Sequence, residues 1–135
     1  MAYKIIDIEG IGPVYGEKLN IAGITYPSDL LKKCASPAGR KALAAETGIS
    51  GDLILRWANH ADLFRVKGVG PQFAELLEAA GVDTVKELSH RVAANLQRKM
   101  EETNKAKRLT RRVPTVKEIQ KMIDQAKELL PVMTY

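Results

Sequence analysis

The chain has 135 residues, of which 45% are hydrophobic, 27% charged and only 5% aromatic, and its formal net charge is +5. This length forms one domain or two small packed halves, and it buries enough surface for a core without crosslinks. One cysteine, Cys34, excludes an intrachain disulfide and a cysteine-based metal site within one chain, and we expect it in the core. The apolar runs are too short to span a bilayer and the N-terminus has no apolar leader, so we expect a cytoplasmic protein that does not associate with membranes.

The elements expected in the first half of the chain are helical. Pro13 suits the first position of a helix, and Gly23 suits the left-handed position that follows the last turn. Ser36 and Pro37 likewise open a helix, and Gly48 ends it. The expected helices span residues 13–22, 27–34, 37–47 and 51–62. Residues 3–8 are the one stretch with the pattern of a short extended segment.

The second half follows the same scheme. Pro71 begins a helix that Gly81 ends, and apolar residues spaced by four (Val92, Leu96 and Met100) predict another. Pro131 stops the last one. The expected helices span residues 71–80, 84–90, 92–106 and 116–129. Because no stretch shows sustained alternation of period two, we predict an all-α fold.

An internal repeat is visible in the sequence. Residues 8–24, IEGIGPVYGEKLNIAGI, match residues 66–82, VKGVGPQFAELLEAAGV, at an offset of 58. A weaker match at an offset of 65 relates residues 54–61 to residues 119–126. We interpret the chain as two repeat units, 1–65 and 66–135, that together form one compact domain. The rise of the offset from 58 to 65 places seven extra residues in the second unit, between residues 82 and 119. This interval includes residues 98–113, which are rich in Lys and Arg.

The repeated pattern resembles the helix-hairpin-helix motif of DNA-repair and recombination proteins, which IEGIGPVYGEKL and VKGVGPQFAELL both match. A wider frame, with TGISGDLILRWANHADLFRVKGVG, AAGVDTVKEL and QAKELLPVMTY, is similar to a small, bacterial-type family of unknown function built on this motif. That resemblance covers nearly the whole chain. It implies an internally duplicated helix-hairpin-helix, SAM-like compact helical domain with pseudo-twofold symmetry.

Such hairpins bind phosphate by a simple mechanism. Their glycines allow a tight turn with positive φ, and the turn leads into a helix N-terminus whose free N–H groups and dipole attract a phosphate oxygen. The contacts read no base sequence. By resemblance, the candidate contacts are Gly10, Gly12, Val14, Gly68, Gly70 and Gln72, with Lys18 and Lys67 nearby. DNA-binding versions often carry Lys or Arg where this chain has Val14 and Gln72, so the alternative that the hairpins only pack the core stays open.

The net charge is concentrated in residues 98–113, which hold seven Lys or Arg against two Glu, a local excess of +5. A basic cluster of this kind binds phosphate polyanions through counterion release, although a solvated loop has the same composition. No aromatic residue lies in the segment, so we expect no base stacking. The candidate cations are Arg98, Lys99, Lys105, Lys107, Arg108, Arg111 and Arg112.

Together these features predict a non-catalytic protein that binds double-stranded DNA without sequence preference and needs no metal or cofactor. The alternative is a protein-interaction or structural scaffold. We expect a monomer or a helix-swapped dimer, in which helix 116–129 packs beside hairpin 8–12 of the same chain or of a partner.

Overall fold

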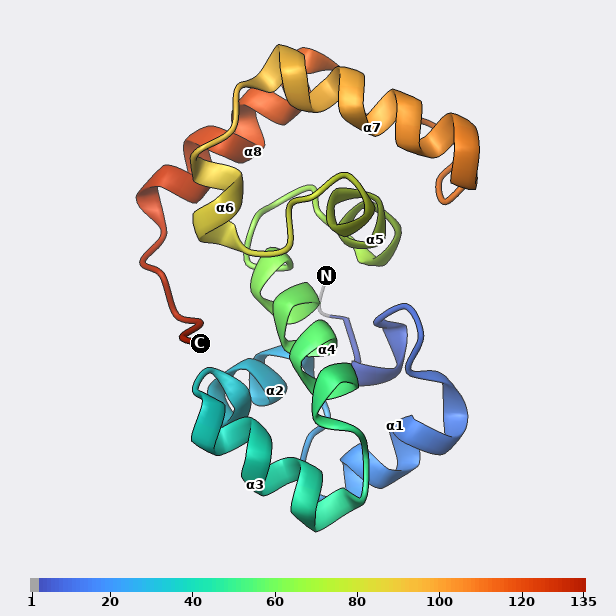
Figure 1. Ribbon diagram of the computed structural model, residues 1–135, viewed down its shortest axis with the longest axis vertical. Coiled ribbons are helices and arrows are strands. Elements are labelled where there is room, and N and C mark those ends of the chain that lie inside the picture. Colours follow the sequence, from blue (N-terminus) through green and yellow to red (C-terminus); the bar gives the residue numbers. More distant parts are fainter. Residues whose placement is uncertain (1–2) are drawn as a thin grey trace. The chain divides into compact units, whose positions relative to one another are not determined.

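The computed structural model describes residues 3–135. Within this range the chain forms eight α-helices and one short 3-10 helix, and no strand, so the all-α prediction is confirmed (Figure 1). None of these helices is long and apolar enough to cross a membrane. The helices are α1 (Gly12–Ile21), α2 (Pro27–Cys34), α3 (Pro37–Thr47), α4 (Gly51–Leu63), α5 (Pro71–Ala79), α6 (Val85–Ser89), α7 (Ala93–Lys107) and α8 (Val116–Glu128).

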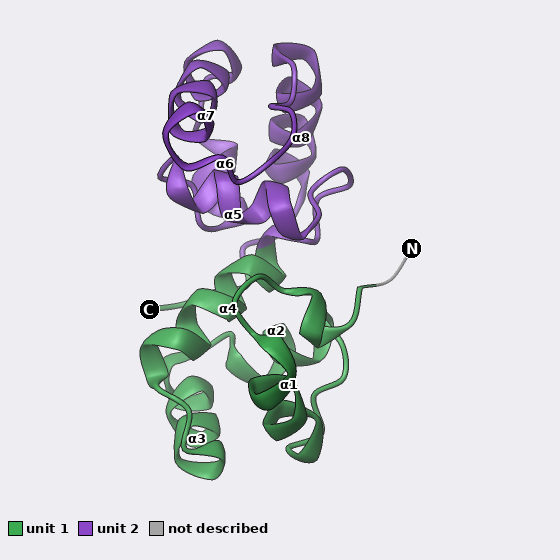
Figure 2. Ribbon diagram, turned by 90° about the vertical axis from the view of Figure 1, so that its right-hand side faces the viewer, with its two compact units in different colours: residues 1–62, 132–135 green, residues 63–131 purple. Residues whose placement is uncertain are grey.

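The chain divides into two compact units, which Figure 2 colours separately. The first contains the residues up to Asp62 and, in addition, Val132–Tyr135. The second contains Leu63–Pro131. The first unit is therefore discontinuous in sequence, because its last four residues follow the whole of the second.

Local signals fix the helix ends of the first unit. The Ser36 hydroxyl accepts a hydrogen bond from the Gly39 N–H at 3.1 Å and so caps α3, and Gly48 ends that helix with φ of 74°. The core includes Leu30, Leu43 and Trp57. Burial of these side chains is what holds the short helices together, since helices of this length are marginal alone.

The expected extended segment at residues 3–8 is largely wrong. Lys4 and Ile8 have extended backbones, but Ile5–Asp7 between them form the 3-10 helix. Its turn is stabilised because the Asp7 carboxylate accepts a hydrogen bond from the Lys4 N–H at 2.8 Å. The turn also buries Ile5, whose N–H donates to the Thr25 carbonyl at 2.8 Å.

The second unit has its own core, built from residues of α5 to α8 and the turns between them. Leu77, Leu88, Met100 and Ile123 are all fully or almost fully buried in it. Helix α8 packs against α6 and α7. Within this chain, α8 lies in the second unit and contacts the second hairpin, so its expected packing beside hairpin 8–12 of the same chain is wrong.

The basic segment is part helix and part loop. Helix α7 continues to Lys107, and Arg108 then adopts the left-handed conformation, with φ of 51°, which ends the helix. The following residues form a loop that reaches α8 at Thr115. Within the loop Leu109 and Val113 pack against the core of the second unit, so the loop is anchored at two points.

Candidate functional site

The first hairpin spans residues 8–12 and leads into α1. Gly10 has a φ of 94° and Gly12 a φ of 65°, values that favour glycine, and both residues are exposed. Ile11 between them is buried, and its N–H donates to the Ile8 carbonyl at 3.2 Å. Under the turn, Trp57 Nε1 lies 3.7 Å from the point where a Cβ on Gly10 would stand. The hairpin is thus anchored in the core by Ile11 and Trp57, while Gly10 and Gly12 face solvent.

The second hairpin, residues 66–70, is built in nearly the same way. Gly68 has a φ of 92°, Val69 is buried, and the Val69 N–H donates to the Val66 carbonyl at 3.2 Å. Gly70 differs, because its φ is −103°, so the expectation of positive φ at both glycines is wrong here. Met122 of α8 lies beneath the turn, its Cε 3.6 Å from a Cβ built on Gly68.

A glutamine from α8 holds the second hairpin in place. The Lys67 N–H donates to Gln125 Oε1 at 3.0 Å, and Gln125 Nε2 donates back to the Lys67 carbonyl at 3.4 Å. Gln125 is not among the residues that the sequence singles out. Its only signal is its position on the polar edge of an amphipathic helix, which does not show what the side chain will meet.

The helices that follow the hairpins begin without capping side chains. Neither α1 nor α5 has a side-chain hydrogen bond at its N-cap or an acidic residue in its first turn, a property shared with α7. By contrast, α2, α6 and α8 place an acid in the first turn, and a serine caps α3. The first N–H groups of an uncapped helix have no intrahelical acceptor, so at α1 and α5 they are available to an anion.

The predicted hairpin contacts lie where an outside ligand reaches them. Val14 and Gln72 stand in the first turns of α1 and α5, and both are exposed. Lys18, further along α1, and Lys67, in the second hairpin, are exposed as well. These residues belong to two different units, so only the second hairpin shares a unit with the basic segment.

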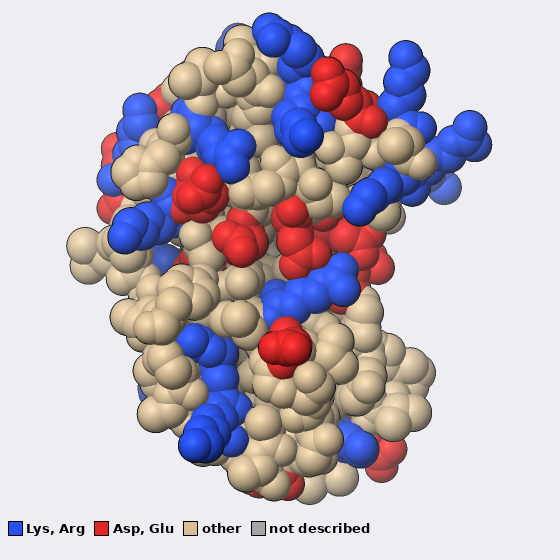
Figure 3. Space-filling model, viewed as in Figure 1, with Lys and Arg blue, Asp and Glu red and all other residues tan. Residues whose placement is uncertain are grey.

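All seven cations of the basic segment are exposed. Arg98 and Lys99 lie in the middle of α7, Lys105 and Lys107 in its last turn, and Arg108 ends it, while Arg111 and Arg112 stand in the loop. Figure 3 shows Lys and Arg side chains projecting over the C-terminal end of α7, with Asp and Glu side chains beside them. The loop is held in shape by Asn104, whose amide group bonds the Thr110 N–H and carbonyl at 2.9 and 3.0 Å.

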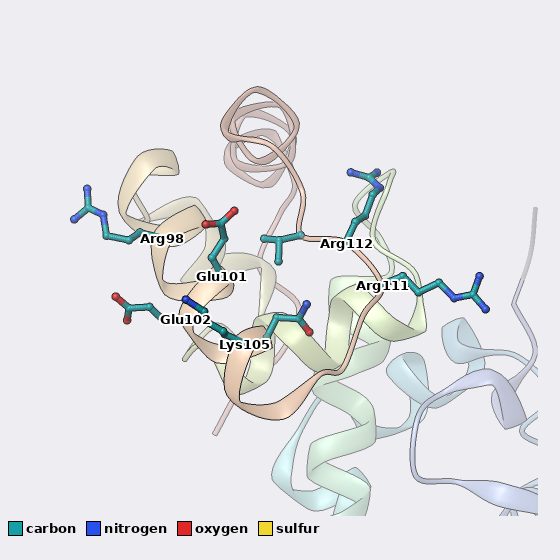
Figure 4. A pocket seen from close by; sticks show the side chains of 8 residues that line it. Arg98, Glu101, Glu102, Lys105, Arg111 and Arg112 are labelled. Carbon is teal, nitrogen blue, oxygen red and sulfur yellow. The ribbon is translucent and has the colours of Figure 1, made fainter.

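An open pocket of about 430 Å³ lies between α7 and this loop. Four of the predicted cations line it, together with two glutamates, Asn104 and Val113 (Figure 4). Arg98 and Arg111 point away from one another in that view rather than toward a common centre. Cations spread around a rim suit an extended polyanion better than a single small anion. The four cations are Arg98, Lys105, Arg111 and Arg112.

Arg112 differs from a free surface cation because it has a strong intramolecular partner. Its two terminal nitrogens donate to the two carboxylate oxygens of Glu118 at 2.8 and 2.9 Å, and its Cζ lies 5.5 Å from the centre of the Phe73 ring in α5. The guanidinium and the Thr115 N–H together lower the pKa of Glu118 from 4.5 to about 2. Counting Glu118, the local charge excess falls from +5 to seven minus three, or +4.

The contact of Arg112 with Phe73 also places the basic loop beside the second hairpin. Phe73 is in the first turn of α5, three residues after Gly70, so Arg112 stands over the start of the hairpin helix. In the sequence alone, Arg112 is one of seven cations with no visible partner. The capping box Thr115-x-x-Glu118 was readable in the sequence, but the role of Glu118 as the partner of Arg112 depends on the path of the loop.

Cys34, the one cysteine of the chain, is buried. Burial raises the pKa of the Cys34 thiol to about 11, so it is almost entirely protonated at neutral pH. Among the residues that the structure describes, no group of three or more His, Cys, Asp or Glu side chains is placed to hold a metal ion.

Fold and surface together define an all-α protein of two helical units, with an exposed basic segment on the second. The chain belongs to the family described as domain of unknown function (DUF4332), whose model matches residues 9–129. A comparison with curated proteins and a comparison with solved structures each gave no match.

Proposed function

We propose that the protein binds nucleic acid without sequence preference and without catalysis, through the phosphates of double-stranded DNA. The observation that carries this proposal is the placement of Arg112 over the first turn of α5, which brings the basic loop beside the second hairpin. A cation-rich surface and an uncapped helix start that adjoin each other both favour phosphate. The cations on the pocket rim point in different directions, which suits a long polyanion that passes several of them.

We also propose that the two units are tandem helix-hairpin-helix repeats. The supporting parallels are specific: Gly10 and Gly68 have φ values of 94° and 92°, and each turn rests on a side chain from the fourth helix of its own unit, Trp57 or Met122. These two side chains correspond at the offset of 65 seen in the sequence. Beyond the hairpins, the Ile24 N–H donates to the Leu19 carbonyl as the Val82 N–H donates to Leu77.

A second candidate function, a protein-interaction scaffold, has one observation in its favour. Helix α1 exposes two apolar side chains, Val14 at 68% and Ile21 at 80%, and residues seven apart lie on one face of a helix. Ile21 also lines an open pocket of about 150 Å³ beside Thr47 of α3. In this reading the first unit binds a protein through this face and its hairpin only packs the core.

The two functions are separated by titrating labelled duplex and single-stranded DNA of random sequence at several salt concentrations, read by fluorescence anisotropy. If four to six cations engage phosphates, log K falls against log salt with a slope of about −4 to −5. A variant with Arg98, Lys105, Lys107 and Arg111 changed to Ala should lose about 3 to 4 of that slope. Arg108 and Arg112 are retained because one ends α7 and the other pairs with Glu118.

The matched control removes four charges elsewhere. Lys32, Lys41, Lys117 and Lys121 are all exposed and lie outside the segment, so changing them to Ala alters the net charge equally. This control should keep most of the affinity and the salt slope. Equal losses in both variants would mean that only net charge matters. No binding at low salt, where screening is weakest, would remove the nucleic-acid function and favour the scaffold.

The hairpins are tested by Val14→Glu and Gln72→Glu. An acid in the first turn of a helix stabilises it through the dipole, so both variants should fold at least as well as the wild type. The same charge occupies the place of the phosphate and should weaken DNA binding about tenfold when both are combined. Gln72→Lys should strengthen binding instead. If neither the introduced acids nor the introduced lysine changes the affinity for DNA, the hairpins do not contact phosphate.

A further inference from the structure

The segment Val132–Tyr135 forms no helix or strand and is hydrogen-bonded to the rest of the first unit. The Thr134 N–H donates to the Ala35 carbonyl at 2.8 Å, and the Thr134 hydroxyl donates to the same oxygen at 3.3 Å. On the other side of the residue, the Thr134 carbonyl accepts a hydrogen bond from Arg40 Nη2 at 2.8 Å. The backbone of Thr134 is therefore recognised through both its donor and its acceptor.

The groups that hold this segment are buried, whereas the segment itself is not. Arg40 is 8% exposed and Asn59 is 6% exposed, while Tyr135 is 70% exposed. The Tyr135 hydroxyl donates to Asn59 Oδ1 at 2.8 Å, and the Tyr135 ring centre lies 5.5 Å from Arg40 Cζ. Binding thus uses the backbone of one residue and the phenol and ring face of the next.

Arg40 is positioned by groups of the first unit that lie outside the segment. Arg40 Nη1 donates to the Cys34 and Ala35 carbonyls at 3.0 and 3.1 Å, at the end of α2, which orients the guanidinium before any peptide arrives. A guanidinium stays charged at every accessible pH, and a buried charged or polar group needs hydrogen-bond partners. Removing the segment therefore leaves a formed site in which Arg40 Nη2 and Asn59 Oδ1 lack the hydrogen-bond partners that the segment provides.

From this geometry we propose that the first unit carries a docking site for a short peptide that contains tyrosine, and that Val132–Tyr135 fills it in cis. A peptide of the same chemistry binds in trans when the tail is released. Ala35 and Arg40 read the backbone of the residue before the tyrosine, and Asn59 reads the phenol. The inference is independent of nucleic-acid binding, since it uses none of the residues of the hairpins or the basic segment.

The test uses the full chain with its tail disabled. In the Thr134→Pro, Tyr135→Ala variant, the N–H that bonds Ala35 and the phenol that bonds Asn59 are both lost. A fluorescein-labelled peptide of residues 129–135 should then bind saturably, as measured by anisotropy. The wild type should bind the same peptide at least tenfold more weakly, because its own tail occupies the site. A folded variant that binds no peptide overturns the proposal.

Matched peptides show which contacts matter. Replacing the tyrosine by phenylalanine removes only the hydroxyl that bonds Asn59, and it should weaken binding about three- to tenfold. Proline in place of the threonine removes the N–H that bonds Ala35, and it should abolish binding. If all three peptides bind equally, the site does not read these groups and the proposal is wrong.

A second measurement needs no variant. In the wild type, the Thr134 amide should exchange with solvent deuterium at least tenfold more slowly than the same residue in the free peptide, as followed by NMR. Addition of excess unlabelled peptide should reduce that protection by competing for the site. Exchange of the Thr134 amide at the free-peptide rate would mean that the tail does not dock, which also overturns the proposal.

Discussion

Arg112 shows how a single side chain can be both a candidate ligand contact and a structural tie. Its bidentate pairing with Glu118 joins the basic loop to the first turn of α8, and Glu118 also accepts from the Thr115 N–H at 3.0 Å. A phosphate that approached the start of α5 would compete with this carboxylate for the guanidinium. A stronger Arg112–Glu118 pair therefore leaves less positive charge for a polyanion to bind.

The pair predicts a specific pH response. Because the folded-state pKa of Glu118 is lowered from 4.5 to about 2, its contribution to stability is complete above about pH 4.5 and is lost as the pH falls through about 2. Carbon-13 NMR of the Glu118 carboxyl group should give a midpoint near 2. Arg112→Gln should raise the midpoint toward 4.5, whereas Arg111→Gln should not move it. A midpoint near 4.5 in the wild type would contradict the pairing.

At the scale of elements, the close approach of the end of α2 to the start of α3 depends on one glycine. A Cβ on Gly39, in the first turn of α3, would clash with the Lys33 carbonyl in the last turn of α2. Gly51, at the start of α4, has nothing within 4 Å of the same point. The two glycines are therefore in opposite situations, although the sequence alone gives no sign of it.

This contrast yields a paired prediction for stability. Gly39→Ala should lower the free energy of unfolding by about 1–3 kcal/mol, because the clash involves backbone and outweighs the better helix propensity of alanine. Gly51→Ala should raise the free energy of unfolding by up to about 1 kcal/mol, because it only removes flexibility. Urea denaturation measures both changes. A stabilising effect of alanine at position 39 would show that the two helices can separate there at no cost.

Helix positions could be predicted from the sequence, whereas helix partners could not. Pro13, Pro71 and the caps at Ser36 and Thr115 act within one turn, so all eight helices appear close to the expected residues. The apolar face of α8 was equally readable. Which surface this face covers depends on contacts between distant residues, and the internal repeat pointed to hairpin 8–12 rather than to the second hairpin.

The same distinction holds for the candidate site. That the cations would be exposed follows from the composition, since a short segment with seven Lys and Arg cannot bury them. The pairing of Arg112 with Glu118 and the grip of Gln125 on Lys67 required the path of a loop and the packing of a helix. Local patterns carry no information about either.

At the scale of the molecule, the second unit has every requirement for independent folding. Its buried cluster runs from Leu63 to Ala126, and the partly buried residues packed against it, such as Phe73 and Leu129, also belong to the unit. It contains the second hairpin and the whole basic segment. The first unit, by contrast, includes residues from both ends of the described chain.

A fragment of residues 63–131 should therefore be helical and melt cooperatively, as measured by circular dichroism. In the DNA titration its salt slope should lie within about one of the value for the full chain, because it retains all seven cations. An unfolded fragment would show that the second unit depends on the first. A folded fragment with a slope near zero would place the electrostatic contacts elsewhere.

The return of the tail to the first unit has a consequence for how the protein is made. On the ribosome, residues 3–62 emerge early, yet the peptide that satisfies Arg40 and Asn59 is translated only after Leu63–Pro131. Under the proposed docking, the site therefore has no occupant from its own chain while Leu63–Pro131 is being synthesised. During that interval a tyrosine-containing segment of another chain can reach the site first, so the order of translation itself sets a window for exchange between neighbouring nascent chains.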